Sequence, residues 1–279
     1  MQNFKSKFLD PDGSKLATLQ TCIRTNDLSL LGDGTHLSLF HMLGNFHFGY
    51  PEDRDNYKNA IIMWDEIIKT LKIPVTSIHV HPTQDEHKQL WINLGYEIIL
   101  DEECTWTDGA IGGYSTEFYV GDLEVGNLVN TLGYSVDVGI GFERLQAILE
   151  GKSRIDESSL FNQDLSPILR DIDRTLTLFY QLNIYPGYRD RHQVCRNLLR
   201  KILDIIPESY TPVYQEWVDK EQKAIQSKSE MARKVFYRHR DKSIDFFKIT
   251  YGIDEDIYFK IKAEFTDVNG NIIRITKDG

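Results

Sequence analysis

Residues 21–49 read TCIRTNDLSLLGDGTHLSLFHMLGNFHFG, and residues 135–145 read SVDVGIGFERL. The first stretch belongs to two extended runs, 16–27 and 35–48, which are separated by Leu31-Gly32-Asp33-Gly34. Glycine beside aspartate is a strong signal for a tight turn between strands. The two runs are therefore predicted to pair as a hairpin.

The second stretch changes from a strand pattern to a helix pattern. Residues 134–138 are predicted to be a strand, and a helix begins near Phe142. Gly139 and Gly141 lie between them, where the absence of a side chain lets backbone and ligand approach closely. Because a helix N-terminus also offers free amides to an anion, a binding site is expected at this junction.

The other elements before Gly151 follow from apolar spacing. Residues 55–72 repeat apolar side chains every three or four positions, which is typical of an amphipathic helix. A further helix is expected at 85–94, and short strands at 76–81, 97–100, 115–120 and 123–130. Hairpins dominate this order, which predicts an α+β fold with an antiparallel sheet flanked by helices.

The composition changes after Gly151 and becomes typical of helices. Helices are expected at 164–183, 191–206 and 212–240. In the tail 258–277, an Asn-Gly pair between apolar runs predicts a hairpin. We therefore expect two domains: residues 1–152 contain the antiparallel sheet, and residues 153–279 form a smaller, mainly helical domain that ends in the C-terminal hairpin.

Composition and charge exclude several classes of protein. The 279 residues contain no apolar run of the roughly 18–20 residues that a membrane span needs, and the N-terminal MQNFKSKFLDPDGSK is not a signal peptide. Three widely spaced cysteines favour reduced thiols, and a cytoplasmic location is expected. The net charge of −10 does not by itself attract nucleic acid, so an RNA-binding role requires local basic faces.

The two opening stretches resemble motifs 2 and 3 of the class II aminoacyl-tRNA synthetases. GNFHFG and VDVGIGFER are similar to sequence motifs in the catalytic core of alanyl-tRNA synthetases. The similarity continues in MQNFKSKFL, in YKNAI and in residues 171–202. The resemblance implies a class II catalytic domain followed by a helical domain that resembles the tRNA-binding region of the family.

The chain also departs from the family pattern. Motif 1 and the editing and C-terminal domains are lacking, so a reduced relative is expected. Thr35 stands where the family has arginine, His41 where it has glutamate, and Gly126 where it has tryptophan. These departures leave open whether the chain is catalytically active, and whether a partner chain supplies the missing N-terminal segment.

The predicted ATP site depends on two arginines, which are also the predicted catalytic residues. Adenylate formation gathers charge on the α-phosphorus, so a fixed cation should contact it. By resemblance, Arg24 contacts the α-phosphate and the carboxylate, whereas Arg144 lies over the adenine and reaches the γ-phosphate. Phe40 is expected on the other adenine face, with Leu39 as the alternative. Gly139 and Gly141 complete the ATP site, and Mg²⁺ is the expected companion of ATP.

Asp137 is the predicted specificity residue for an amino acid. By resemblance its carboxylate holds the α-ammonium group, although a strand-end aspartate can also cap the following helix. Trp106 is expected as an apolar wall of the same pocket, and Asn127 as an amide donor.

The basic residues Arg191, Arg196, Arg200 and Lys201 occur at helical spacing and resemble the family helix that contacts the tRNA acceptor stem. The alternative is a solvated helix face paired with nearby acids. No metal site is predicted, because His36, His41 and His47 fall on different faces of one strand.

The leading hypothesis is an alanine–tRNA ligase-like enzyme. It would use ATP to activate a small amino acid, alanine first and glycine or serine appreciably, and transfer it to tRNA. One alternative passes the adenylate to a carrier protein or a small-molecule acceptor. The other is a noncatalytic paralogue that binds an amino acid or a nucleotide.

Overall fold

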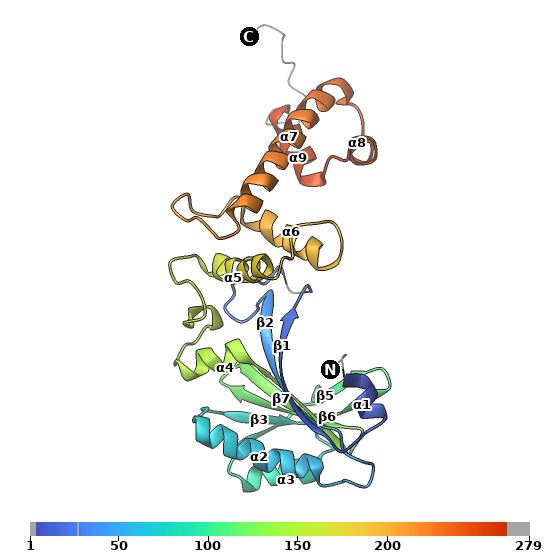
Figure 1. The fold of residues 1–279 in the computed structure, drawn as a ribbon, viewed down its shortest axis with the longest axis vertical. Coiled ribbons are helices and arrows are strands. Elements are labelled where there is room, and N and C mark those ends of the chain that lie inside the picture. Colours follow the sequence, from blue (N-terminus) through green and yellow to red (C-terminus); the bar gives the residue numbers. More distant parts are fainter. Residues whose placement is uncertain (1–3, 27, 267–279) are drawn as a thin grey trace. The chain divides into compact units, whose positions relative to one another are not determined.

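The computed structural model describes residues 4–26 and 28–266 (Figure 1). The chain divides into two compact units, Met1–Thr175 and Leu176–Gly279. The first is called here the sheet unit and the second the helical unit. The sequence-based domain boundary lies at 152–153, before helix α5, and as a boundary between functional domains it stays a prediction.

The sheet unit is built on eight strands in the order β1-β2-β8-β7-β6-β3-β4, with β5 paired to β6. The β1–β2 hairpin is confirmed, with Lys15 opposite His47 and Ile23 opposite Leu39. The pairs are antiparallel except β3–β4, which is parallel. The strands are β1 Lys15–Ile23, β2 Leu39–His47, β3 Ser77–Val80, β4 Ile98–Leu100, β5 Thr105–Asp108, β6 Ile111–Val120, β7 Leu123–Thr131 and β8 Ser135–Gly141.

Helices cover one face of this sheet (Figure 1). In α2 the side chains of Tyr57, Ile61 and Ile68 recur at helical spacing and are buried, which is why this segment folds as an amphipathic helix. They join Trp91 of α3 and Leu128 of β7 in the main core. The helices of this unit are α1 Lys5–Leu9, α2 Asn56–Leu71, α3 Asp85–Asn93, α4 Phe142–Leu149 and a 3₁₀ turn at Ile155–Glu157. On the other face, Phe8 of α1 packs against Phe46 and Ile111, and the rest of the central strands is left for a site.

The helical unit has its own core. Phe236, Phe247 and Tyr258 are almost fully buried and their rings contact one another. Helix α5 begins in the sheet unit and ends in the helical unit. The helices are α5 Pro167–Gln181, α6 Asp190–Ile202, α7 Gln215–His239, α8 Ile244–Tyr251 and α9 Glu255–Glu264.

The predicted C-terminal hairpin is wrong in its first part, because α9 extends to Glu264. Its apolar residues Ile257 and Ile261 are spaced for a helix and pack in the core of the helical unit. The predicted turn at 268–271 lies outside the described residues. Among the described helices, none is sufficiently long and apolar to cross a membrane.

Candidate functional site

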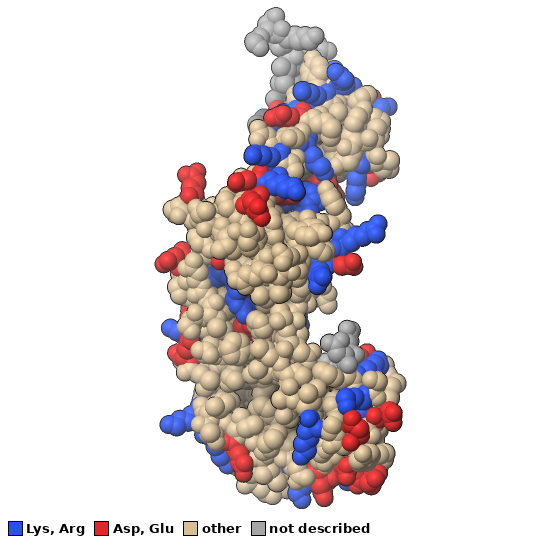
Figure 2. All heavy atoms as spheres, in the orientation of Figure 1, with Lys and Arg blue, Asp and Glu red and all other residues tan. Residues whose placement is uncertain are grey.

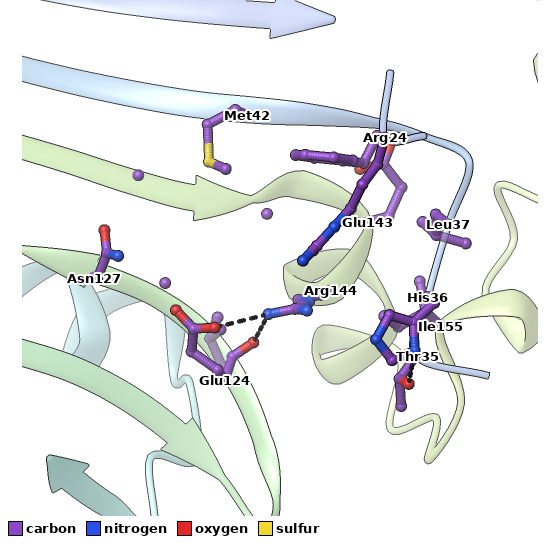
Figure 3. A pocket seen from close by; sticks show the side chains of 15 residues that line it. Arg24, Thr35, His36, Leu37, Met42, Glu124, Asn127, Glu143, Arg144 and Ile155 are labelled. Atoms are coloured by element: carbon purple, nitrogen blue, oxygen red, sulfur yellow. Dashed lines mark hydrogen bonds and ion pairs between the residues drawn. The ribbon is translucent and has the colours of Figure 1, made fainter. Parts of the chain in front are cut away.

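The open face of the sheet carries a pocket, called here the arginine pocket, of about 680 Å³ including its mouth (Figure 3). The end of β1, the start of β2, β7, β8 and the first turn of α4 all contribute to its walls. Its lining residues are Arg24, Thr35, His36, Leu37, Phe40, Met42, Glu124, Val125, Gly126, Asn127, Gly139, Gly141, Glu143, Arg144 and Ile155.

Two guanidinium groups from distant parts of the sequence enter this pocket. Arg24 follows the last residue of β1, and its backbone N–H donates to the Ser38 carbonyl at 2.9 Å. Its side chain extends toward Arg144 of α4 (Figure 3). Arg144 Nη1 donates to the Glu124 carbonyl at 2.6 Å and lies 3.3 Å from Glu124 Oε2. The arrangement presents two cations to one cavity, which suits a polyanion such as a nucleoside triphosphate.

A second hollow, called here the Asp137 pocket, adjoins the first. Met42, Asn127 and Gly139 line both. A Cβ on Gly139 would lie 3.1 Å from the Met42 sulfur, so a larger residue at position 139 would crowd the boundary between the two pockets. The other lining residues are Gln20, Cys22, Gly44, Phe46, Trp106, Thr107, Asp108, Val129, Asp137 and Val138. A single molecule that extends past the shared wall can therefore contact both pockets.

The carboxylate of Asp137 is only partly exposed. Within the described residues it makes no hydrogen bond or ion pair. Burial raises its pKa to about 6, because the charged form loses solvation. A partly desolvated carboxylate that makes no hydrogen bond or ion pair with the described residues is suited to accept a cationic group from a ligand.

A second carboxylate, Glu143 of α4, is buried and fully engaged. Its Oε2 accepts the His41 backbone N–H at 2.9 Å, and its Oε1 lies 2.7 Å from His41 Nδ1. The Arg174 guanidinium donates to the same oxygen Oε1 and, at 3.1 Å, to the Leu39 carbonyl. These contacts fix the backbone on either side of Phe40, whose side chain lines the arginine pocket.

The loop before β2 is fastened by residues much later in the sequence. Asp171 accepts hydrogen bonds from the Ser38 N–H at 3.0 Å and from the Ser38 hydroxyl at 2.6 Å. Burial raises the pKa of Asp171 to about 6, although these hydrogen bonds oppose the rise. Arg154 donates to the carbonyls of Gly32 and Asp33 at 2.9 and 3.0 Å. One wall of the arginine pocket therefore depends on residues 154–174.

The structure brings the predicted ATP residues Arg24, Phe40, Gly139, Gly141 and Arg144 into the arginine pocket. Leu39, the alternative to Phe40, is 1% exposed and does not line it.

The predicted amino-acid residues Trp106, Asn127 and Asp137 all line the Asp137 pocket. Sequence reasoning missed Glu143 and Arg174. The signal available for them was a charged residue on the inward side of an otherwise apolar helix pattern.

The four predicted tRNA residues divide into two pairs. Arg196 Nη2 and Arg200 Nε lie 3.1 and 2.6 Å from Glu221 Oε1, and Arg200 also contacts Asp254 at 3.4 Å. These two arginines match the alternative interpretation, a helix face paired with acids. Arg191 and Lys201 are exposed. Contact of this helix with tRNA stays a prediction.

Two of the three histidines of the β2 region, His36 and His41, are engaged with carboxylates. His36 Nδ1 lies 2.6 Å from Asp33 Oδ2, and His41 contacts Glu143. Among residues 4–26 and 28–266, no three His, Cys, Asp or Glu side chains are grouped so that they could hold a metal ion.

Comparison with known proteins shows similarity to one group of enzymes. The sequence model described as "tRNA synthetases class II (A)" matches residues 1–105. Alanine–tRNA ligase of Desulfitobacterium hafniense (strain Y51) is 28% identical over 73% of this chain, and that of Petrotoga mobilis is 25% identical over 97%. A Helicobacter pylori alanine–tRNA ligase is 30% identical over 64% of this chain. The chain spans 30%, 40% and 26% of the length of these three relatives.

Among solved structures, pyrrolysyl-tRNA synthetase from Desulfitobacterium hafniense aligns with a TM-score of 0.33 at 16% identity, covering 56% of this chain and 49% of that one. The sequence matches extend beyond the two motifs and include curated relatives over most of the chain. Residues 1–105 therefore match the class II aminoacyl-tRNA synthetase model, and the chain is similar to alanine–tRNA ligases over most of its length.

Proposed function

We propose that the chain activates a small amino acid, alanine in the first place, with ATP, giving an aminoacyl-adenylate and pyrophosphate. The observation that carries this proposal is the adjacency of the two pockets. Arg24 and Arg144 line one, Asp137 lines the other, and Met42, Asn127 and Gly139 line both. An aminoacyl-adenylate has its groups in the matching order: a nucleoside, then the α-phosphate, then the aminoacyl group with its ammonium.

The residues divide the chemical work as follows. An oxygen of the amino-acid carboxylate attacks the α-phosphorus, and the bond to the departing pyrophosphate breaks. Arg24 contacts the α-phosphate and the carboxylate and stabilises the charge that gathers between them. Arg144 binds the nucleotide beside Glu124, and Asp137 holds the α-ammonium so that the carboxylate faces the phosphorus. Mg²⁺ enters as part of the MgATP substrate.

Transfer of the aminoacyl group to the 3′ end of tRNA is the proposed second step. A second candidate passes the adenylate to a carrier protein or a small-molecule acceptor. It is favoured by the pairing of Arg196 and Arg200 with Glu221, because that pairing engages two of the four cations predicted to contact tRNA. Aminoacylation of bulk tRNA separates the two candidates.

ATP–pyrophosphate exchange with each of the twenty amino acids tests the first step. We expect exchange with alanine. Glycine and serine should also support it, since one methylene or hydroxyl in an apolar pocket changes transition-state binding by only about 1–3 kcal/mol. Arg24→Ala and Asp137→Ala should each lower the exchange rate roughly 100-fold or more. Exchange at the parent rate in both variants would refute the assigned site, and no exchange by the parent chain with any amino acid would refute the activity.

A further inference from the structure

The loop between α5 and α6 exposes two tyrosines. It reads NIYPGYR over residues 183–189. Tyr185 is 62% and Tyr188 is 76% exposed, although tyrosine is usually at least half-buried in folded proteins. Large aromatic rings on a connecting loop are frequent at binding surfaces.

Both rings are held in place from one side. The Arg196 guanidinium lies 4.4 Å from the centre of the Tyr188 ring, and Arg196 is itself paired with Glu221. The ring centres of Tyr185 and His192 are 4.6 Å apart, and His192 Nδ1 lies 2.7 Å from the Tyr185 carbonyl oxygen. The rings are therefore preorganised, and little freedom is lost when a partner stacks on them.

The charges around the tyrosines are mainly positive. Arg189 and Arg191 are exposed and flank one acid, Asp190. Residues 176–279 contain 18 Lys and Arg against 15 Asp and Glu, whereas residues 1–175 contain 14 against 27. Figure 2 shows Lys and Arg side chains spread over the visible face of the helical unit. A polyanion is therefore attracted to the helical unit more than to the sheet unit.

We propose that Tyr185, Tyr188, Arg189 and Arg191 form a surface that binds unpaired nucleotides of an RNA. The bases stack on the tyrosine rings, and the two arginines contact the phosphates. Arg196 then supports the Tyr188 ring from behind and makes no phosphate contact itself. This inference rests on the proposed transfer to tRNA, and it names unpaired nucleotides as the part of the RNA that this surface recognises.

Fluorescence anisotropy of the full chain tests the surface without any catalytic step. Two labelled RNA hairpins with the same stem are compared, one with a short unpaired 3′ tail and one blunt. We expect tighter binding of the tailed hairpin. Tyr188→Ala and Tyr185→Ala should weaken it roughly 5- to 100-fold and leave the blunt hairpin unchanged. Tyr188→Phe should bind like the parent, because the ring is kept.

The matched control is Tyr237→Ala, since Tyr237 is a 46% exposed tyrosine of the same unit and lies on α7. It should not change RNA binding. Arg189→Ala with Arg191→Ala should weaken binding of the tailed hairpin and reduce its salt dependence by about 1.4 in log–log slope. ATP–pyrophosphate exchange should stay at the parent level in every one of these variants.

The proposal is overturned if the parent chain does not prefer the tailed hairpin, or if Tyr188→Ala and Tyr237→Ala have equal effects. It is also overturned if Tyr188→Ala weakens both hairpins alike, because ring stacking would then not be the contact. A protein partner at this loop would give the first of these results. Failure of the exchange reaction with intact RNA binding would refute the proposed activation step and leave this surface standing.

Discussion

Replacement of Asp137 by asparagine should stabilise the unliganded protein at neutral pH while it abolishes amino-acid activation. Burial raises the pKa of Asp137 from 3.8 to about 6. At about 1.4 kcal/mol for each pH unit, ionisation of Asp137 costs the folded state up to about 3 kcal/mol. Because the pKa of Asp137 is higher in the folded state than in the unfolded state, the protonated carboxyl contributes stability below pH 4. This contribution is lost as pH rises through 6. Asparagine has no proton to lose.

Urea unfolding of the parent and of Asp137→Asn, followed by tryptophan fluorescence at pH 4.5 and pH 7.5, measures this effect. Three of the four tryptophans, Trp64, Trp91 and Trp106, lie in the sheet unit and report on its unfolding. We expect the variant to gain about 1–3 kcal/mol on the parent between the two pH values. A difference that does not change with pH would refute the reasoning.

Asp171→Asn is the matched control for this experiment. The pKa of Asp171 is also raised to about 6 by burial, but its carboxylate accepts hydrogen bonds from the Ser38 N–H and hydroxyl. The amide loses part of this acceptor capacity, so no net gain in stability is expected at pH 7.5.

Three further predictions concern catalysis and packing. Arg24→Ala should lower kcat/KM for ATP–pyrophosphate exchange roughly 100- to 1,000-fold, and Arg24→Lys should recover little of it, because a planar guanidinium contacts two oxyanions at once; equal rates for the lysine variant and the parent would contradict this. Glu143→Gln should destabilise the protein by about 3–5 kcal/mol in urea unfolding, because Arg174 loses the partner of a buried ion pair; an unchanged midpoint would be the contrary result. The KM for the amino acid should rise as pH falls below about 6, since protonated Asp137 cannot pair with an ammonium group; a flat profile of KM against pH would exclude this carboxylate.

The elements that could be predicted from the sequence are those with a strong local pattern. The β1–β2 hairpin has turn residues between two extended runs, and α2 has apolar residues at helical spacing. Strand β5 was missed, because Thr105–Asp108 is short and is defined by its pairing with β6. The sequence predicts part of a hairpin where α9 forms, since Tyr258, Phe259 and Ile261 favour strands as isolated residues. Its helical state depends on packing in the core of the helical unit.

Some residues of the candidate site could likewise be predicted from local motifs, and others could not. Arg24, Asp137 and Arg144 belong to motifs that could be recognised, and the structure places them around two adjoining pockets. The contacts of Arg174 with Glu143 and Leu39 join residues 31 and 135 positions apart, and no pattern in the sequence pairs them. The arginine pairs of α6 with Glu221 were open to two interpretations, because the acid that engages them lies on another helix.

The fastening of the β2 segment by Asp171 and Arg174 has a practical consequence for anyone who wishes to cut out a minimal adenylating fragment. A fragment that stops after the sheet, near residue 152, would retain every arginine and carboxylate assigned to the reaction but would lose the residues that hold Ser38 and Leu39. Such a fragment should bind nucleotide poorly. A fragment that continues through the whole of α5 should keep the segment around Ser38 and Leu39 in place beside the arginine pocket. Expression clones should therefore be designed to end beyond Gln181.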